Sequence, residues 1–143
     1  MDDADAAALE HERRVLDRLE ERARVLVGDR GTVERLSWSD VIWVVDITPA
    51  NLNARRIRIV AEQRLLVSVG DRGGQFELSY SADDEAFAAQ VIESVIAGRV
   101  YETLGVWGTT THVEFEDGQR TSETAIAVWK RPGRSKRRPY EPY

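Results

Sequence analysis

The feature that most constrains the fold is a series of four stretches in which apolar residues recur at every second position. These stretches are 37–49, 54–61, 64–70 and 75–80. A period of two is the pattern of a β-strand that buries one face. Only short turns separate the last three stretches, so the sequence predicts an antiparallel meander there. The first stretch is apolar on both faces, which predicts a central strand that is partly covered on each side.

Two amphipathic helices are expected, one before this meander and one after it. Residues 5–26 carry leucine and alanine at seven-residue spacing, which is typical of a helix with one apolar stripe. The second helix has Ser81 as its candidate N-cap, Asp84 three residues later and Gly98 as its candidate stop. The first helix needs an apolar partner, which is either the sheet of its own chain or the same helix of a second chain.

Three more extended runs follow the second helix, at 99–107, 109–116 and 119–129. Asp117–Gly118 lies between the last two runs and predicts a hairpin with a two-residue loop. The complete order predicts an α+β fold: a mainly antiparallel sheet of about five to seven strands, with the N-terminal helix and the middle helix packed on it. We expect residues 1–129 to form this single domain and residues 130–143 to form a basic tail that contains Pro and Tyr.

Composition excludes several classes of site and of segment. The 143 residues contain no cysteine, which excludes disulfides, zinc–thiolate sites, iron–sulfur clusters and a cysteine nucleophile. The acidic N-terminus has no apolar run of signal-peptide length, and no stretch approaches the ~18 residues of a membrane span. We therefore expect a cytoplasmic protein that contacts no membrane. Its strong preference for arginine over lysine indicates a bacterial genome of high GC content.

The net charge of −5 conceals a division between the two parts of the chain. Residues 1–129 hold 24 acidic and 14 basic side chains, a net charge of −10, whereas residues 130–143 hold six basic residues and one acidic residue. Two interpretations fit this division. In one, the tail binds an acidic partner such as nucleic acid, with phosphates held by the basic side chains and bases stacked on tyrosine. In the other, the tail lies on its own acidic body or on a neighbouring copy. The basic candidates are Lys130, Arg131, Arg134, Lys136, Arg137 and Arg138.

One cluster in the predicted hairpin has the residue types of a metal or acid–base site. A two-residue loop at Asp117–Gly118 places His112 opposite Glu123, with Glu114 beside them on the same face. An imidazole and two carboxylates are ligands for a divalent metal and groups for proton transfer. The simpler interpretation is a solvent-exposed strand face with an ordinary cross-strand pair, and it makes these residues weak metal candidates. No catalytic residues and no cofactor are predicted.

The function that these patterns favour is a small non-enzymatic protein-binding module. An acidic body attracts basic partners over long range, and four tryptophans are many for this length. An acidic inhibitor, an immunity-type protein or an adaptor fits this description, as does self-association into a homodimer. The alternative is a nucleic-acid-associated protein that acts through residues 130–143. The protein-interface candidates are Trp38, Asp40, Asp46, Trp107 and Trp129.

Overall fold

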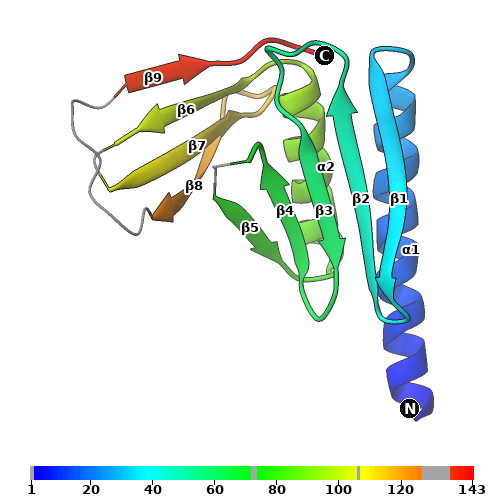
Figure 1. The fold of residues 1–143 in the computed structure, drawn as a ribbon. Helices are drawn as coiled ribbons and strands as arrows, with labels where there is room; N and C mark the ends of the chain where they lie inside the picture. Colours follow the sequence, from blue (N-terminus) through cyan, green and yellow to red (C-terminus); the bar gives the residue numbers. More distant parts are fainter. Residues whose placement is uncertain (1, 72–73, 106, 127–135) are drawn as a thin grey trace.

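The computed structural model describes residues 2–71, 74–105, 107–126 and 136–143. Its strands form two antiparallel sheets, one with the order β1-β2-β3-β4-β5 and one with the order β8-β7-β6-β9 (Figure 1). This confirms the α+β class with an N-terminal and a middle helix, and it divides the strands between two sheets. The elements are α1 (Asp3–Val27), β1 (Gly31–Ser39), β2 (Ile42–Pro49), β3 (Ile57–Ala61), β4 (Leu65–Val69), β5 (Gln75–Leu78), α2 (Ala82–Ile96), β6 (Val100–Leu104), β7 (Gly108–Glu114), β8 (Arg120–Ile126) and β9 (Lys136–Pro139).

Helix α1 packs on its own chain. A capping box between Asp2 and Asp5 begins the helix, and the backbone N–H of Gly28 bonds to the Arg24 carbonyl at its end. The residues of its buried stripe join the core formed by the first sheet and α2. Of the two partners that its amphipathic pattern allows, the structure therefore shows the sheet of the same chain. The fully buried members of the stripe are Val15, Leu16, Leu19, Ala23 and Val27.

The first sheet has one face toward both helices and one face away from them (Figure 1). Its inner face carries the apolar residues that the alternating pattern predicts, and they pack with α1 and α2 in one core. On its outer face, Leu36, Val44, Val60 and Leu66 occupy paired positions across four strands. The inner-face residues from β2, β3, β4 and β5 are Trp43, Val45, Ile47, Ile57, Ile59, Ala61, Leu65, Val67, Val69 and Phe76.

The prediction of one strand over 37–49 was wrong, because a hairpin turn at Asp40 and Val41 divides it. Strand β1 begins earlier, at Gly31, and pairs with β2. The Ser39 hydroxyl accepts a hydrogen bond from the Val41 backbone N–H, which fixes the turn. The register shifts between Ser37 and Ser39, so Trp38 is the extra residue of a β-bulge. Val41, in this turn, is 41% exposed.

Helix α2 begins where its sequence predicts. The Ser81 side chain accepts a hydrogen bond from the backbone N–H of Asp84, as expected of an N-cap. The Asp84 carboxylate bonds to Ser79 instead of completing a capping box with Ser81. Two ion pairs then join α2 to α1, Arg18 with Glu85 at 2.6 Å and Arg22 with Glu93 at 2.9 Å.

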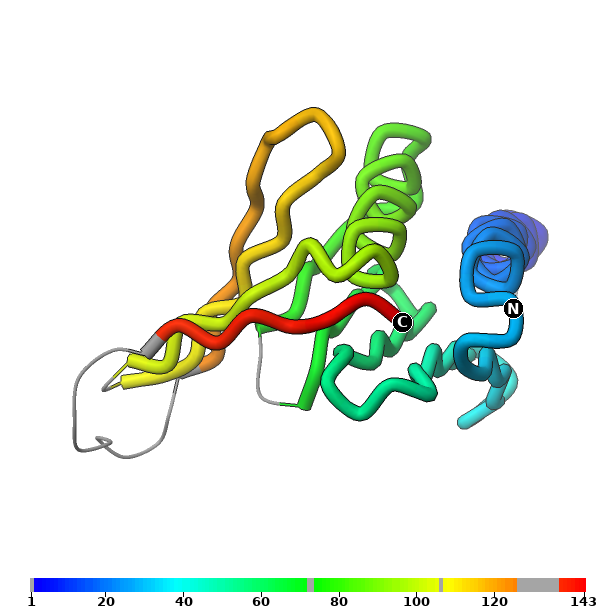
Figure 2. Tube along the Cα trace, turned by 90° about the horizontal axis from the view of Figure 1, so that it is seen from above, coloured from blue at the N-terminus to red at the C-terminus, as the bar shows by residue number. Residues whose placement is uncertain are grey.

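The C-terminal residues 136–143 pack on the body and connect the two sheets. Strand β9 pairs with β6, and the chain then crosses toward the first sheet, as Figure 2 shows in red. Tyr143 ends this crossing as a buried residue whose hydroxyl donates to the Arg55 carbonyl at 2.6 Å, with the Ile47 carbonyl as a second, weaker acceptor at 3.3 Å. Gly98 is required beneath the crossing: its φ is +81°, and a Cβ there would lie 2.6 Å from the Pro142 nitrogen.

Candidate functional site

The β7–β8 hairpin does not gather the three residues proposed as a weak metal site. His112 pairs with Ser122, and Glu123 pairs with Thr111 on the opposite face of the sheet. The loop is one residue longer than predicted, because Phe115 pairs with Gln119 and Gly118 adopts a φ of +88°. A shift of one residue moves a side chain to the other face. Within the described part of the chain, no group of three or more His, Asp or Glu side chains is arranged to hold a metal.

His112 instead belongs to a hydrogen-bonded and stacked arrangement on the second sheet. Its Nε2 and Nδ1 atoms lie 3.1 Å and 2.8 Å from the hydroxyls of Thr103 and Ser122. Its ring stacks on Tyr101, with 4.5 Å between the centroids. Burial, together with the nearby guanidinium groups of Arg120 and Arg137, lowers the pKa of His112 below its usual 6.5.

The lowered pKa of His112 predicts a pH dependence of stability. The folded protein takes up this proton less readily than the unfolded chain, so the proton destabilises the fold as the pH drops below about 6.5. We expect the melting temperature of the wild type to fall more than that of His112→Gln between about pH 7.5 and about pH 5. Thermal unfolding at stepped pH measures this difference, and equal losses in the two proteins would contradict it.

Two of the predicted interface residues meet on the outer face of the first sheet. Trp38 is 56% exposed, and the Arg58 guanidinium lies 5.6 Å from its ring centroid. Asp46 accepts two hydrogen bonds from the same guanidinium, at 2.7 Å and 2.8 Å. Arg58 therefore connects the tryptophan to the carboxylate. Asp40 lies in the β1–β2 turn and Trp107 is exposed before β7, so neither shares this surface. Trp129 lies outside the described residues.

Of the six basic residues predicted to bind nucleic acid, the structure describes three and leaves three outside the described residues. Lys136, Arg137 and Arg138 are residues of β9, whereas Lys130, Arg131 and Arg134 lie outside the described residues. Arg137 pairs in register with Thr103, and Arg138 pairs with the buried Glu102. The alternation of the strand therefore points these two arginines to opposite faces of the second sheet.

A buried charged group lies where the C-terminal crossing meets both sheets. Glu102 is 1% exposed and forms an ion pair of 2.6 Å with Arg55. The Tyr140 hydroxyl donates to the other Glu102 oxygen at 3.0 Å, and the Arg55 guanidinium lies 4.0 Å from the Tyr140 ring centroid. Burial first, and then the Glu102 charge, raise the pKa of Tyr140. These contacts join the second sheet, the C-terminal crossing and the segment between β2 and β3.

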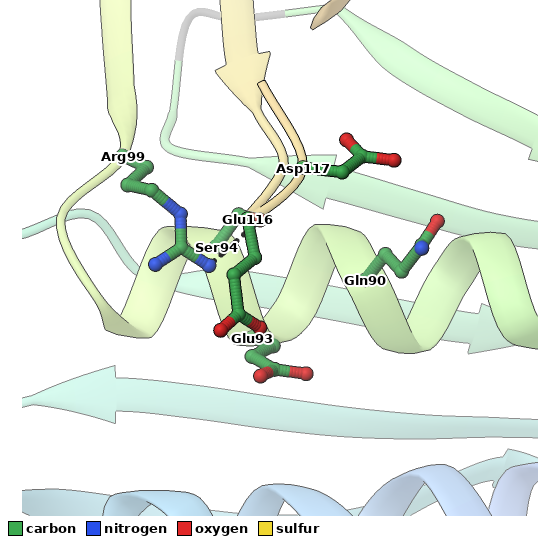
Figure 3. Close-up of a pocket in the computed structure, with 6 residues that line it drawn as sticks. All are labelled: Gln90, Glu93, Ser94, Arg99, Glu116 and Asp117. Carbon is green, nitrogen blue, oxygen red and sulfur yellow. Dashed lines mark hydrogen bonds between the residues drawn. The ribbon is translucent and has the colours of Figure 1, made fainter. Parts of the chain in front are cut away.

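A polar hollow of about 310 Å³ lies between α2 and the β7–β8 turn (Figure 3). Arg99 enters it and donates to the Glu114 carbonyl at 3.2 Å, and Glu93 is engaged with Arg22 of α1. All six residues that line this hollow have polar or charged side chains. The lining residues are Gln90, Glu93, Ser94, Arg99, Glu116 and Asp117.

A larger hollow of about 530 Å³ lies beside the first half of α1, next to the β1–β2 and β3–β4 turns. Its apolar lining consists of aliphatic side chains, and three carboxylates surround them. We call this hollow the acidic groove. Its residues are Asp5, Ala8, Leu9, Glu12, Val41, Ile42, Glu62 and Gln63.

Three carboxylates make the acidic groove negative, and none of the eight residues that line it is basic. Arg13, the neighbour of Glu12 in the sequence, lies over the Trp43 ring at 4.5 Å. Burial raises the pKa of Glu12 above its usual 4.5. The arrangement suits a ligand that combines an apolar group with a positive charge.

The sequence did not single out this groove, because its lining comes from three separated segments. Asp40, which was singled out, lies in the same turn as Val41. The one sequence signal for the groove was Leu9. This residue continues the apolar stripe of α1 toward the N-terminal end of the helix, which the sheet does not bury.

No helix in the described residues is long and apolar enough to cross a membrane. Comparison with known proteins adds no relative to these observations: no family model, curated protein or solved structure matches this chain.

Proposed function

We propose that this chain is a non-enzymatic protein-binding module that takes a basic partner in the acidic groove. The observation that carries this proposal is an aliphatic hollow of about 530 Å³ with carboxylates at its margin. Anchoring side chains at protein interfaces fill such apolar pockets, and charged contacts at the margin select the partner. The matching partner segment presents an aliphatic side chain flanked by lysine or arginine.

The charge distribution supports the same kind of partner. Residues 1–98, which form both helices and the first sheet, hold 19 acidic and 12 basic side chains, a net charge of −7. A surface of one sign accelerates encounter with a partner of the opposite sign, and salt weakens that steering. An acidic inhibitor or immunity-type protein that neutralises a basic partner, or an adaptor in the cytoplasm, is the biological role that we infer.

Substituting Val41 tests the groove with little risk to the fold, because this residue lies in a turn and is 41% exposed. We expect Val41→Asp to weaken binding of a fluorescent peptide of lysine and leucine by about tenfold or more, since a carboxylate would replace part of the apolar lining. The matched control is Val25→Asp, at a position of α1 that is 74% exposed and outside the groove. Fluorescence anisotropy measures both affinities.

Two further peptides separate the contributions of charge and of the apolar anchor. Replacing leucine with serine leaves only the charge, and replacing lysine with glutamate leaves only the apolar groups. We expect both changes to weaken binding to the wild type. Equal effects of Val41→Asp and Val25→Asp would refute the groove as the binding site. In capture from native lysate after nuclease treatment, a protein supports the proposal only if Val25→Asp retains it and Val41→Asp loses it.

A further inference from the structure

The second sheet has an open face that differs in chemistry from the rest of the protein. The opposite face buries Glu102, Thr109, Thr111 and Val113. The described residues place no helix over the open face (Figure 1). That face combines aromatic, hydroxyl and guanidinium groups, and we call it the stacking face. Its residues, taken from the strand registers, are Tyr101, Thr103, Thr110, His112, Glu114, Arg120, Ser122, Thr124 and Arg137.

Three planar groups form a column on the stacking face. The Arg137 guanidinium lies 4.0 Å from the Tyr101 ring centroid, and the Tyr101 ring stacks on His112 with an angle of 13° between the planes. Hydroxyls bond to both nitrogens of the His112 ring, so the ring is fixed in the column. The column is therefore ordered before any ligand binds, which lowers the entropic cost of stacking another planar group on it.

The column ends in an exposed cation. Arg137 is exposed on the edge strand, so a further planar group can stack on its guanidinium. Hydroxyls of Ser122 and Thr124 are exposed on the other edge of the same face. Arg120 lies beside them and is 3.6 Å from Glu114. These groups are donors of the kind that bind phosphate oxygens.

Along the sequence, positive charge is concentrated in residues 99–143. Residues 99–143 hold eight basic and six acidic side chains, a net charge of +2, against −7 for residues 1–98. Four of the eight basic residues, at 130, 131, 134 and 136, lie in the segment that leads into Arg137. This charge balance along the sequence favours the attraction of a polyanion by residues 99–143 over its attraction by residues 1–98.

We propose that the stacking face binds single-stranded nucleic acid, with a base stacked on Arg137 and phosphates held by Arg120 and the neighbouring hydroxyls. Unpaired bases stack on aromatic rings and on guanidinium planes in single-strand recognition, whereas a duplex keeps its bases covered. This site is separate from the acidic groove, and neither proposal depends on the other.

The test uses the full chain and fluorescein-labelled oligo-dT and oligo-U in anisotropy titrations at several salt concentrations. We expect Arg137→Gln and Tyr101→Leu each to weaken binding by about tenfold, and Tyr101→Phe to retain it because the ring remains. Arg120→Gln should reduce the slope of log affinity against log salt by about 0.7, the contribution of one phosphate on a single strand. Arg14→Gln on α1 is the matched control, since it makes the same change in net charge.

Three outcomes would overturn the proposal. The first is no binding of either oligonucleotide by the wild type at about 50 mM salt. The second is an equal effect of Arg14→Gln and Arg137→Gln, which would show that only net charge matters. The third is equal binding of polyphosphate together with no effect of Tyr101→Leu, which would show a phosphate patch without base stacking. Val41→Asp should leave oligonucleotide binding unchanged, so failure of one site is distinguishable from failure of the other.

Discussion

Replacing Tyr143 with alanine is expected to lower the free energy of unfolding by about 3–5 kcal/mol, the range measured when a buried aromatic side chain is truncated. The Tyr143 ring belongs to the main core, and its hydroxyl donates mainly to the Arg55 carbonyl and more weakly to the Ile47 carbonyl. Its backbone N–H bonds to the Ile96 carbonyl. Loss of the ring therefore opens a cavity at the point where the C-terminal crossing joins the first sheet and α2. Urea unfolding measures the change as a shift in midpoint at constant slope.

The variant Tyr143→Phe separates the ring from the hydroxyl. Burial raises the pKa of Tyr143 well above its usual 10, so the hydroxyl stays a hydrogen-bond donor at all ordinary pH values. Removing it leaves the Arg55 carbonyl without its donor and the Ile47 carbonyl without a weaker one, and we expect a smaller loss of about 1–2 kcal/mol. A Tyr143→Ala loss no larger than that of Tyr143→Phe would show that the ring does not anchor the crossing.

Glu102→Ala is expected to destabilise the protein by a similar amount, about 3–5 kcal/mol, because it leaves the charge of Arg55 largely buried without its partner. The Arg55 side chain is only 18% exposed, and its guanidinium lies 2.6 Å from Glu102. Tyr140 would also lose the acceptor of its hydroxyl. Urea unfolding of the single variant gives this value.

The double variant Arg55→Met with Glu102→Leu tests whether the charge itself is the cause. Replacing both members of a buried ion pair with apolar residues of similar volume is often close to neutral. We therefore expect the double variant to be more stable than Glu102→Ala by about 2 kcal/mol or more. If the double variant loses as much stability as Arg55→Met and Glu102→Leu lose together when each is measured alone, Arg55 and Glu102 contribute independently.

The β7–β8 hairpin shows how far the sequence can determine a site. The alternation of residues and the Asp117–Gly118 dipeptide correctly predicted two paired strands. The same dipeptide also fits a three-residue loop with Gly118 in a left-handed conformation, and the structure adopts that loop. One added residue moved Glu123 away from His112. The strands were therefore predictable from local pattern, whereas the composition of each face was not.

The prediction of one continuous strand where the structure has the β1–β2 hairpin failed for a related reason. The apolar residues on both sides of Asp40 suggested one continuous strand, and the short polar side chains of Ser37 and Ser39 gave no strong turn signal. In the structure these serines satisfy the turn backbone, and Trp38 forms a bulge. Side-chain hydrogen bonds of this kind compete with strand extension and are weakly encoded in the residue pattern.

The sequence alone determined the elements whose signals are local: the capped helix α2, the apolar stripe of α1 and the alternating inner face of the first sheet. Only the tertiary structure decided the division into two sheets, the acidic groove, the stacking face and the burial of Tyr143. The physical reason is separation along the chain. Tyr143 bonds to a carbonyl 96 residues away, and the groove draws on α1 and two distant turns. Such contacts form because the whole chain buries its apolar surface together, and no short segment encodes them.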